Sequence, residues 1–501
     1  MEGKEKLDGI GRLSVLMSFV LDWKEKLERE ELEVEMVGKK PLCMNQYTNI
    51  FSVTRIPREG VDELVKTPPE KSTHAIVLYQ QQIFTFPLYH KGRRLNSHEI
   101  QSQFHTLIHL TSLPHFEKQE DVAILTSGER SEWARVRKAL EEFHPNNKHN
   151  LELIDTSLFA IALDSNSTES ADERAKLSLV GKNGEGRWFD KSFNLILYKD
   201  GSIGANGEHS PSDAPAPALV FQTAFARESK ESYEQVVKTR QLRADYLPLP
   251  LHLKWNLFPS LLSSIRQAQL LGKELYEKTD VRVLRFSDYG SNFISSLQVP
   301  PDSWAQIAIQ LSYFRVHGKL TAIYETGSTR GFKHGRTDTV RSLTFDVANF
   351  VNNFDDPNLS PLHKMKLFAK AVSSHREYLV ASVRGQAIDR HFFGLKILAS
   401  QLKIQVPFFS SYAFQETSNW RLSTSNMNPS DFWFCGFGAV VEDGYGICYC
   451  TRSDNLKFSI ANFTKGNNNS TCAIKFREVL SKTLYDLREM STLAKNDQPK
   501  L

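Results

Sequence analysis

The stretch that decides the fold is DKSFNLILYKDGSIGANGEHSPSDA, residues 190–214. Its first part, Asp190–Tyr198, is an apolar and aromatic run with the length of a strand, and Lys199-Asp200-Gly201 supplies a turn. A flexible Gly-Asn-Gly passage then presents His209, with Asp213 four residues later. Loops at strand ends are where catalytic groups usually lie. The stretch therefore predicts a strand that leads to a functional histidine.

Strands and helices alternate on both sides of this stretch. Residues 74–88 predict a strand–turn–strand unit, Ser97–Thr111 a helix with Ser97 as its N-cap, and Glu129–Phe143 another helix. Further elements follow in the second half: helices over Trp304–Lys319, Pro361–Val383, His391–Leu402 and Ala473–Leu493, and two strands around Asp443-Gly444 within Phe432–Tyr449. This order favours an α/β layered fold.

The length of 501 residues exceeds what one hydrophobic core usually supports, so two domains are expected. Residues 226–244 are strongly charged and predict a solvated helix and linker. Tyr246-Leu247-Pro248-Leu249-Pro250 then interrupts regular structure. We therefore predict an N-terminal domain over residues 1–250 and a C-terminal domain over residues 251–501.

Charge and cysteine content limit the class of protein. The chain carries 62 basic and 58 acidic residues, which is too balanced for a nucleic-acid binder with a basic stripe. The five cysteines are sparse and odd in number, which predicts reduced thiols in an intracellular compartment. Cys448 and Cys450 lack the spaced partners of a zinc site, so no metal is expected. Val15–Leu21 is too short to span a bilayer, so no transmembrane segment is expected.

His209 suits proton transfer. A neutral histidine near pH 7 can take a proton from an alcohol or a thiol, as acyl transfer in both directions requires. The alternative is a loop histidine capped by Asp213, and this segment alone leaves both interpretations open.

Other motifs accompany His209 along the chain. In order they are Pro41-Leu42-Cys43-Met44-Asn45-Gln46-Tyr47, Arg187-Trp188-Phe189-Asp190-Lys191-Ser192, Tyr324-Glu325-Thr326, Gly335-Arg336-Thr337-Asp338-Thr339-Val340-Arg341-Ser342, Asp389-Arg390-His391, Ser423-Thr424-Ser425 and Asp443-Gly444-Tyr445-Gly446. Each motif is weak by itself, but the ordered set resembles the carnitine/choline acyltransferase family from about Gly38 to the C-terminus. The helical N-terminal stretch that members carry is short here.

The resemblance implies a coenzyme A-dependent acyltransferase fold. Such a fold has two domains, each a mixed sheet flanked by helices, with a tunnel between them that carnitine and the thioester enter from opposite ends. His209 would be the general base toward carnitine's hydroxyl or the thiol of coenzyme A. Ser425 would donate a hydrogen bond to the oxyanion, an interaction of about 2.7–4 kcal/mol in a preorganised site. The alternative for Ser423–Ser425 is a polar strand edge.

Carnitine carries a carboxylate and a quaternary ammonium, so its site needs hydroxyl donors and an arginine. The resemblance gives this role to Tyr324, Thr337, Arg390, Tyr47 and Ser423. Choline-using relatives replace the arginine and the threonine, so L-carnitine is the expected acceptor. The alternative for Arg390 is a salt bridge on the helix surface with Asp389 or a neighbouring residue. Three charged motif residues are expected to hold loops together instead: Arg187, Asp190 and Asp338.

For coenzyme A the resemblance implies Asp302, Thr326, Asn426 and Asp213. Members bind the 3′-phosphate through lysines ahead of Asp302, but Ser291 and Ser295 stand in those places and Ser287–Ser303 contains no Lys or Arg. Losing two cations should weaken binding, unless nearby residues compensate: Lys278, Arg282 or Arg285. A catalytically impaired protein that binds acyl ligands or partners is therefore the rival interpretation.

The acyl group and the location of the protein are also constrained by resemblance. Cys435 and Gly436 match the family's acyl pocket, and cysteine is intermediate between the large residue of acetyl-specific members and the glycine of longer-chain members. A short- or medium-chain acyl group is expected, with acetyl transfer as the alternative. Pro499-Lys500-Leu501 resembles the Ser-Lys-Leu peroxisomal address. The peroxisome is thus expected, with the cytoplasm as the alternative and the mitochondrion less favoured.

The expected partners are acyl-coenzyme A and L-carnitine, with coenzyme A as a substrate, no cofactor and a monomeric protein of fatty-acid metabolism. A serine hydrolase is disfavoured because no Gly-x-Ser-x-Gly elbow occurs in the chain.

Overall fold

The computed structural model describes residues 8–231, 246–427, 433–464 and 471–496. The chain forms two compact units, one of Met1–Val34 with Met44–Glu277, the other of Glu35–Cys43 with Lys278–Leu501. The boundary thus lies after helix α8 (Pro259–Lys278), not at the predicted residues 246–250. The reason is packing, because three apolar residues of α8 are buried in the core of the first unit: Leu261, Ile265 and Ala268.

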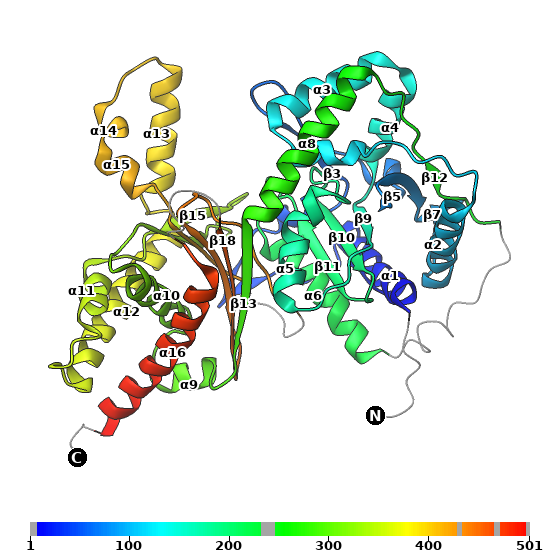
Figure 1. The fold of residues 1–501 in the computed structure, drawn as a ribbon. Helices are drawn as coiled ribbons and strands as arrows, with labels where there is room; N and C mark the ends of the chain where they lie inside the picture. Colours follow the sequence, from blue (N-terminus) through cyan, green and yellow to red (C-terminus); the bar gives the residue numbers. More distant parts are fainter. Residues whose placement is uncertain (1–7, 232–245, 428–432, 465–470, 497–501) are drawn as a thin grey trace. The chain divides into compact units, whose positions relative to one another are not determined.

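The first unit is built on a six-stranded mixed sheet (Figure 1). Its strands, in spatial order, are β11 (Ile203–Gly207), β10 (Phe193–Tyr198), β9 (Ala160–Asp164), β5 (His74–Tyr79), β6 (Gln82–Pro87) and β12 (Leu251–His252). Strand β9 pairs in parallel with β5 and β10, and the other pairs are antiparallel. All six residues of β10 are buried, as expected for a central strand covered on both faces.

Helices surround this sheet. They are α1 (Gly9–Glu28), α2 (Ser97–Ser112), α3 (Arg130–Phe143), α4 (Pro145–Thr156), α5 (Ala171–Val180), α6 (Pro215–Lys230) and α8. The described part of the unit also contains short 3-10 helices: η1 (Asn45–Asn49), η2 (Pro69–Lys71), η3 (Val122–Ser127) and η4 (Lys182–Gly184). Strand β3 (Val53–Ile56) forms a hairpin with β4 (Glu63–Lys66), and β7 (Tyr89–His90) forms one with β8 (Arg93–Arg94). Helix α1 packs against α2 and α6.

Most local predictions for this unit are confirmed, with corrections at the cap of α2, at the start of β10, which begins at Phe193 and not at Asp190, and at the passage before His209. Residues 74–88 form the β5–β6 hairpin, whose two turn residues, Gln80 and Gln81, have φ of 51° and 65°, as in a tight two-residue turn. Helix α2 is capped by Asn96, not by the predicted Ser97. The Asn96 side chain accepts from the amides of His98 and Glu99, and the Glu99 carboxylate returns to the Asn96 amide. Of the predicted charged segment 226–244, residues 232–245 lie outside the described residues.

The stretch before His209 is more regular than predicted. Gly204–Gly207, expected to be a flexible passage, forms most of edge strand β11, which pairs with β10 from Leu197↔Ile203 to Phe193↔Gly207. At Gly204 a Cβ atom would lie 2.5 Å from Ser178 Oγ, so glycine is required for this close approach. The Asn206 side chain donates to two carbonyl oxygens of α5, those of Ser178 and Leu179, both at 3.1 Å. The strand end that carries His209 is therefore anchored.

The second unit contains another six-stranded mixed sheet. Its strands, in spatial order, are β13 (Thr279–Phe286), β18 (Leu456–Phe463), β17 (Tyr445–Thr451), β16 (Leu422–Asn426), β14 (Ile323–Ser328) and β15 (Thr337–Val340). Strand β16 runs parallel to both neighbours, and the other pairs are antiparallel. The predicted α/β class with two mixed sheets flanked by helices is confirmed.

The helices of the second unit pack mainly through three members. In the part of the unit that the structure describes, they are α9 (Ser291–Ser296), α10 (Pro301–His317), α11 (Phe345–Asn353), α12 (Pro361–Val383), α13 (Asp389–Gln401), α14 (Pro407–Ser410), α15 (Tyr412–Thr417) and α16 (Ala473–Asn496). Helices α10, α12 and α16 contact one another and the sheet. The core between them includes Trp304, Phe350 and Phe368, all 0% exposed. Burying a phenylalanine of this kind contributes about 1.5–3 kcal/mol.

One strand prediction is wrong. Phe432–Tyr449 was expected to give two strands around Asp443-Gly444, but residues 433–444 form no strand and β17 begins only at Tyr445. The reason lies in the sheet, because β17 is already paired with β16 on one side and β18 on the other. No edge remains for a hairpin partner. Residue 432 lies outside the described part.

A short segment near the N-terminus belongs to the second unit. Glu35–Cys43 contains the hairpin of β1 (Met36–Val37) with β2 (Lys40–Pro41). Arg330, 6% exposed, fastens this segment: its guanidinium lies 2.5 Å from the Glu35 carboxylate and 3.1 Å from the Cys43 carbonyl, and its own carbonyl accepts from the Cys43 amide at 2.7 Å.

Among the helices that the structure describes, none combines the length and apolar character needed to cross a membrane.

Candidate active site

His209 lies in the loop that follows β11, and charged neighbours hold the start of this loop. The Glu208 amide donates to the Ser192 carbonyl at 3.1 Å, continuing the β10–β11 pairing. The Glu208 carboxylate accepts from the Ser210 amide at 2.9 Å and from the Ser210 hydroxyl, and Arg55 lies 3.4 Å away. These contacts fix the residues on both sides of His209.

The second half of the loop is held by η1. The Gln46 side chain donates to the Asp213 carboxylate at 2.8 Å and accepts from the Asp213 amide at 2.7 Å. The Asn49 side chain donates to the Pro211 carbonyl at 3.2 Å. Asp213 is 7% exposed, so its carboxylate belongs to the framework of the His209 loop. Its assignment to coenzyme A stays a prediction.

Tyr47 follows Gln46 and is fully buried. Its ring lies 5.7 Å from the ring of Trp23 in α1, which in turn contacts Phe51. This aromatic packing places η1, and with it Gln46, against the helices of the first unit. The assignment of Tyr47 to carnitine stays a prediction.

Strands β14 and β16 sort the predicted residues of the second unit onto one face. Side chains alternate along a strand, and Tyr324 pairs with Ser423 while Glu325 pairs with Thr424. The predicted site residues Tyr324, Thr326, Ser423 and Ser425 therefore share one face, which we call the substrate face. The residues that alternate with them, Glu325, Thr424 and the predicted coenzyme A residue Asn426, point to the opposite, helix-covered face.

Three predicted carnitine residues come together on the substrate face. The Arg390 guanidinium, from the first turn of α13, donates to the Thr337 carbonyl at 3.0 Å and to the Thr337 hydroxyl at 3.2 Å. It also donates to the Tyr324 hydroxyl at 3.4 Å. One guanidinium and two hydroxyls thus converge, which is the donor set that a carboxylate requires.

The alternative assignment for Arg390 was a salt bridge with Asp389. The Asp389 carboxylate instead accepts two hydrogen bonds from Arg341, from Nε at 2.9 Å and from Nη2 at 2.8 Å. Arg341 in turn lies over the ring of Trp420, 4.8 Å from its centre. Arg390 bonds instead to the Thr337 carbonyl and to the hydroxyls of Thr337 and Tyr324.

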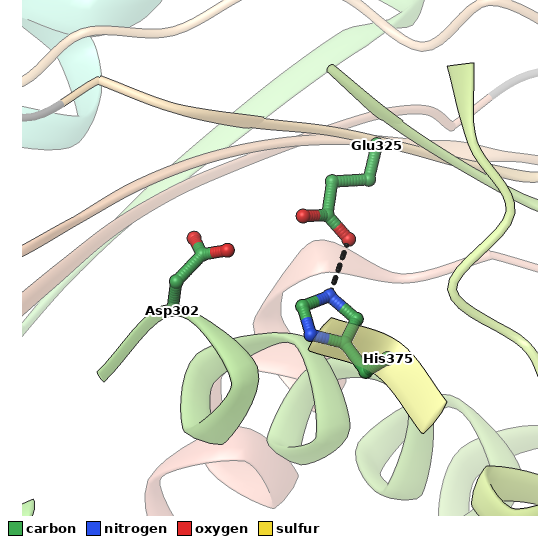
Figure 2. Close-up of side chains that lie close together, drawn as sticks. All are labelled: Asp302, Glu325 and His375. Atoms are coloured by element: carbon green, nitrogen blue, oxygen red, sulfur yellow. Dashed lines mark hydrogen bonds and ion pairs between the residues drawn. The ribbon is translucent and has the colours of Figure 1, made fainter. Parts of the chain in front are cut away.

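Beneath the substrate face, Asp302, Glu325 and His375 gather from α10, β14 and α12 (Figure 2). His375 Nε2 lies 2.8 Å from the Glu325 carboxylate, and its Nδ1 lies 2.8 Å from the Ser303 hydroxyl. Burial, with the nearby Asp302 carboxylate adding to it, raises the pKa of Glu325 to about 7. Burial alone would lower the pKa of His375, but the Glu325 carboxylate outweighs it and raises that pKa above the ordinary value.

Two of the predicted coenzyme A residues touch each other. The Asn426 side chain donates to the Asp302 carboxylate at 2.8 Å, and the Tyr449 hydroxyl donates to the same oxygen at 2.6 Å. Thr326 lies on the substrate face of β14, opposite Thr339 of β15. The structure thus brings Asp302 and Asn426 together but shows them binding protein groups.

The positions of the missing lysines fall on or beside α9. Ser291 begins this helix and Ser295 is exposed on it. Of the cations that could compensate, Arg282 is paired with Asp280 at 3.0 Å, and Lys278 lies 5.3 Å from the centre of the Phe463 ring. Arg285 is exposed.

A small cavity lies beside Ser425. Cys435 lines it together with Cys448 and Cys450 of β17, and Cys448 is the direct neighbour of Ser425 in the sheet. The Cys448 thiol lowers the pKa of the Cys435 thiol by hydrogen bonding. About 10 Å³ of the cavity is open to the centre of a water molecule, which is room for one methyl-sized group. At Gly436 a Cβ would lie 2.7 Å from Ser459 Oγ, so this position has no space for a side chain.

Of the three charged motif residues expected to hold loops, Arg187 and Asp190 join segments that are separate in the sequence. Arg187 is 0% exposed and lies 2.8 Å from the Asp164 carboxylate. The Asp190 carboxylate accepts from the Trp133 indole at 2.7 Å and from Arg130 at 2.5 Å. The Asp338 carboxylate accepts from the Thr339 amide at 2.7 Å.

Sequence reasoning did not identify Gln46 or His375 as functional. His375 lies on the same helical face as the buried Phe368 and Ala371, at the spacing of a core position, so a polar residue there was the available signal. Glu325 was named only as part of a motif. Its position between Tyr324 and Thr326, which lie on the substrate face, places its side chain on the buried face of the sheet. For Gln46 no signal pointed to Asp213, which is 167 residues away in the sequence.

Comparisons with known proteins bear on this arrangement. A family model described as choline/carnitine O-acyltransferase matches residues 2–482. The chain is 33% identical over 493 residues to carnitine O-acetyltransferase from Rattus norvegicus, covering 95% of this chain and 76% of that protein. It is 31% identical over 498 residues to choline O-acetyltransferase from Danio rerio, covering 96% and 76%. It is also 31% identical over 505 residues to the muscle isoform of carnitine O-palmitoyltransferase 1 from Homo sapiens, covering 97% and 64%.

Among solved structures, the chain is similar to the epimerization domain of tyrocidine synthetase B, with 10% identity and a TM-score of 0.31 over 67% of this chain and 80% of that chain.

Proposed function

Because the chain belongs to the choline/carnitine O-acyltransferase family, we propose that it transfers an acyl group reversibly between coenzyme A and the hydroxyl of L-carnitine. His209 takes the proton of the attacking hydroxyl or thiol, and Ser425 donates a hydrogen bond to the oxyanion of the tetrahedral intermediate. No metal or redox cofactor takes part in these steps.

The observation that carries the choice of acceptor is the convergence of Arg390, Thr337 and Tyr324. The names of the relatives differ on this point, since one is a carnitine and another a choline acetyltransferase. Choline has no carboxylate for an arginine to bind, whereas carnitine does. The three donors therefore support carnitine.

Arg390→Ala is expected to raise the KM for carnitine about 10- to 100-fold. The reason is the loss of a charge-assisted hydrogen bond to a carboxylate, which is worth roughly 1.5–3 kcal/mol. The KM for acyl-coenzyme A should stay unchanged, because that substrate does not use this arginine. Steady-state kinetics with each substrate varied in turn measures both values.

Arg384→Ala is the matched control, since Arg384 is also an exposed arginine of this region but has no role in the proposed site. A preference of the unaltered protein for choline over carnitine would contradict the Arg390 assignment.

The size of the cavity at Cys435 favours acetyl over longer acyl groups. A space for one methyl-sized group accommodates an acetyl chain, while a medium chain needs the walls to move. The relatives' names include both acetyl and palmitoyl transfer, so they leave this choice open. Acetyl-coenzyme A is accordingly the first acyl donor to test.

Cys435→Gly is expected to shift the preference toward longer chains. Removing the thiol opens the cavity beside Ser425, and each methylene that enters contributes about 0.8 kcal/mol, or about fourfold in kcat/KM. The ratio of kcat/KM for butanoyl- to acetyl-coenzyme A measures the shift. Cys472→Gly, at an exposed cysteine away from the cavity, is the control. An unchanged ratio in Cys435→Gly would remove this residue from the acyl pocket.

The direct test offers the purified protein acyl-coenzyme A of several chain lengths with carnitine and follows release of the free thiol. Thiol release that depends on carnitine supports the proposed function. If no acyl-coenzyme A releases thiol, the catalytically impaired protein is favoured. The serines Ser291 and Ser295, in place of lysines, would then account for the loss of activity. Isothermal titration with coenzyme A then tells whether binding survives.

We further propose that the protein is peroxisomal and monomeric, and one feature of the sequence supports the location. The supporting feature is the C-terminal Pro499-Lys500-Leu501, which lies outside the described residues. Microscopy of the full chain with and without its last three residues tests the location, and light scattering tests the oligomeric state.

A further inference from the structure

A buried polar layer lies directly beneath the substrate face. Ser425 lies between Thr424 and Asn426, and both of these point to the helix-covered face of the sheet. Tyr324 is likewise followed by Glu325, which is 2% exposed. Each residue that would touch substrate is therefore adjacent in the sequence to a residue whose side chain lies in the buried polar layer.

Hydrogen bonds link this layer across β14, β16, β17 and α10. Gln306 of α10 is fully buried and donates to the Thr424 hydroxyl and to the Tyr449 hydroxyl, both at 2.9 Å. The Thr424 hydroxyl donates to the Tyr324 carbonyl at 2.7 Å. Asp302 accepts from Asn426 and Tyr449. Both residues that flank Ser425 are thus tied to α10.

The charges of the layer meet at one point. Asp302, Glu325 and His375 offer ligand atoms that all lie within 4.8 Å of one another. Figure 2 shows the two carboxylates facing each other, with His375 bound to the far side of Glu325. Two negative charges this close in a buried site repel strongly, so a proton between them is favoured.

We propose that Glu325 and His375 are positioning residues for acyl transfer, because together they hold a proton beside Asp302 and thereby keep Thr424, Asn426 and the intervening Ser425 in place. This inference rests on the proposed function. When the proton is present, the Asp302 carboxylate keeps its hydrogen bonds from Asn426 and Tyr449. When it leaves, the Glu325 and Asp302 carboxylates repel each other and Asp302 is displaced from these two donors. Ser425 then loses its alignment with the oxyanion.

The same three residues are also the donor set of a divalent cation site. Both ring nitrogens of His375 already have partners at 2.8 Å, and one oxygen of Asp302 has two donors. The contacts in the cluster are thus those of a hydrogen-bonded network, and no cation is needed to satisfy them.

The groups that face Glu325 give the direction of the pH effect. Within the described residues they are the titratable Asp302 of α10, His375 of α12 and Tyr449 of β17, and the neutral Ser303, Gln306, Thr424, Asn426 and Val340. The pKa of Glu325 is raised from 4.5 to about 7. The proton is therefore held in acid and lost as the pH rises through about 7, so kcat should fall on the alkaline side.

Glu325→Gln tests this directly, because the amide can donate to Asp302 at every pH and still accept from His375. We expect the alkaline loss of kcat to move up by at least about one pH unit, while the acid limb of the pH profile stays unchanged. His375→Gln should move the same limb upward, because it removes the positive charge that favours ionised Glu325. A purely structural role would lower kcat equally at all pH values, and that result would overturn the proposal.

Asp121→Asn is the matched control. Asp121 is a carboxylate of the first unit that is 3% exposed, and burial raises its pKa to about 7 as well. Its replacement should leave the pH profile of kcat unchanged. A shift equal to that of Glu325→Gln would show a general effect of buried carboxylates and would also overturn the proposal.

Thermal unfolding separates this inference from the proposed function. When folding raises the pKa of a carboxyl group, the group stabilises the folded protein fully at a pH below its pKa in the unfolded state. This stabilisation is lost as the pH rises through the pKa in the folded state. Between pH 5 and pH 8 the Tm of the unaltered protein should therefore fall by a few degrees relative to Glu325→Gln. A constant difference would overturn proton holding by Glu325. An inactive protein that still shows the change would place the failure in the proposed function.

Discussion

His209→Ala is expected to lower kcat for acyl transfer by about 10²- to 10⁴-fold, the range that a positioned general base contributes. Without the imidazole, the attacking hydroxyl or thiol must lose its proton to water. The KM values for carnitine and for acyl-coenzyme A should change little, since the ring acts on the reacting atom. Thiol release in both reaction directions, followed as a function of substrate concentration, provides kcat and KM.

His149→Ala serves as the control, because His149 is an exposed histidine on α4 of the same unit. Its activity should equal that of the unaltered protein. Activity of His209→Ala within about twofold of the unaltered protein would be incompatible with a general base at this position. Unfolding curves of the two variants establish that both are folded.

Ser425→Ala is expected to lower kcat by about 10²- to 10³-fold, as observed when one donor to an oxyanion is removed. Ser425 lies on the substrate face, next to Cys448 of the cavity wall, and the proposed function puts the carbonyl oxygen of the acyl group beside its hydroxyl. The donor acts mainly on the charged intermediate, so the change should appear in kcat with KM nearly constant.

Ser423→Ala provides the contrast from the same strand. Ser423 lies two residues earlier on the same face and pairs with Tyr324. Its assignment to carnitine predicts a higher KM for carnitine with kcat preserved. If Ser425→Ala also acted only through KM, the oxyanion role of Ser425 would be wrong.

Local sequence patterns predicted the elements of this fold well where local forces decide them. The β5–β6 hairpin and helix α12 follow from alternation and helical periodicity within short windows. The region before Tyr445 was mispredicted because the neighbours of β17 come from distant parts of the chain. The capping of α2 was missed by one residue, although Asn96 and Glu99 have the spacing of a capping box.

For the candidate site, ordered motifs located residues whose contacts the structure then revealed. Arg390, Thr337 and Tyr324 were named together, and they are hydrogen-bonded. The buried layer could not be predicted, because Glu325 and His375 are 50 residues apart and nothing local joins them. Burial in the folded sheet, not residue type, gives the Glu325 carboxylate its raised pKa.

The path of the chain through Glu35–Cys43 has a consequence for biosynthesis. This segment leaves the ribosome before its anchor, Arg330, which follows Cys43 by 287 residues. The second unit therefore cannot complete its native contacts until both parts have been made, and long-range closure of this kind slows folding. Expression of residues 278–501 alone would yield a fragment in which the Arg330 guanidinium lacks Glu35 and Cys43.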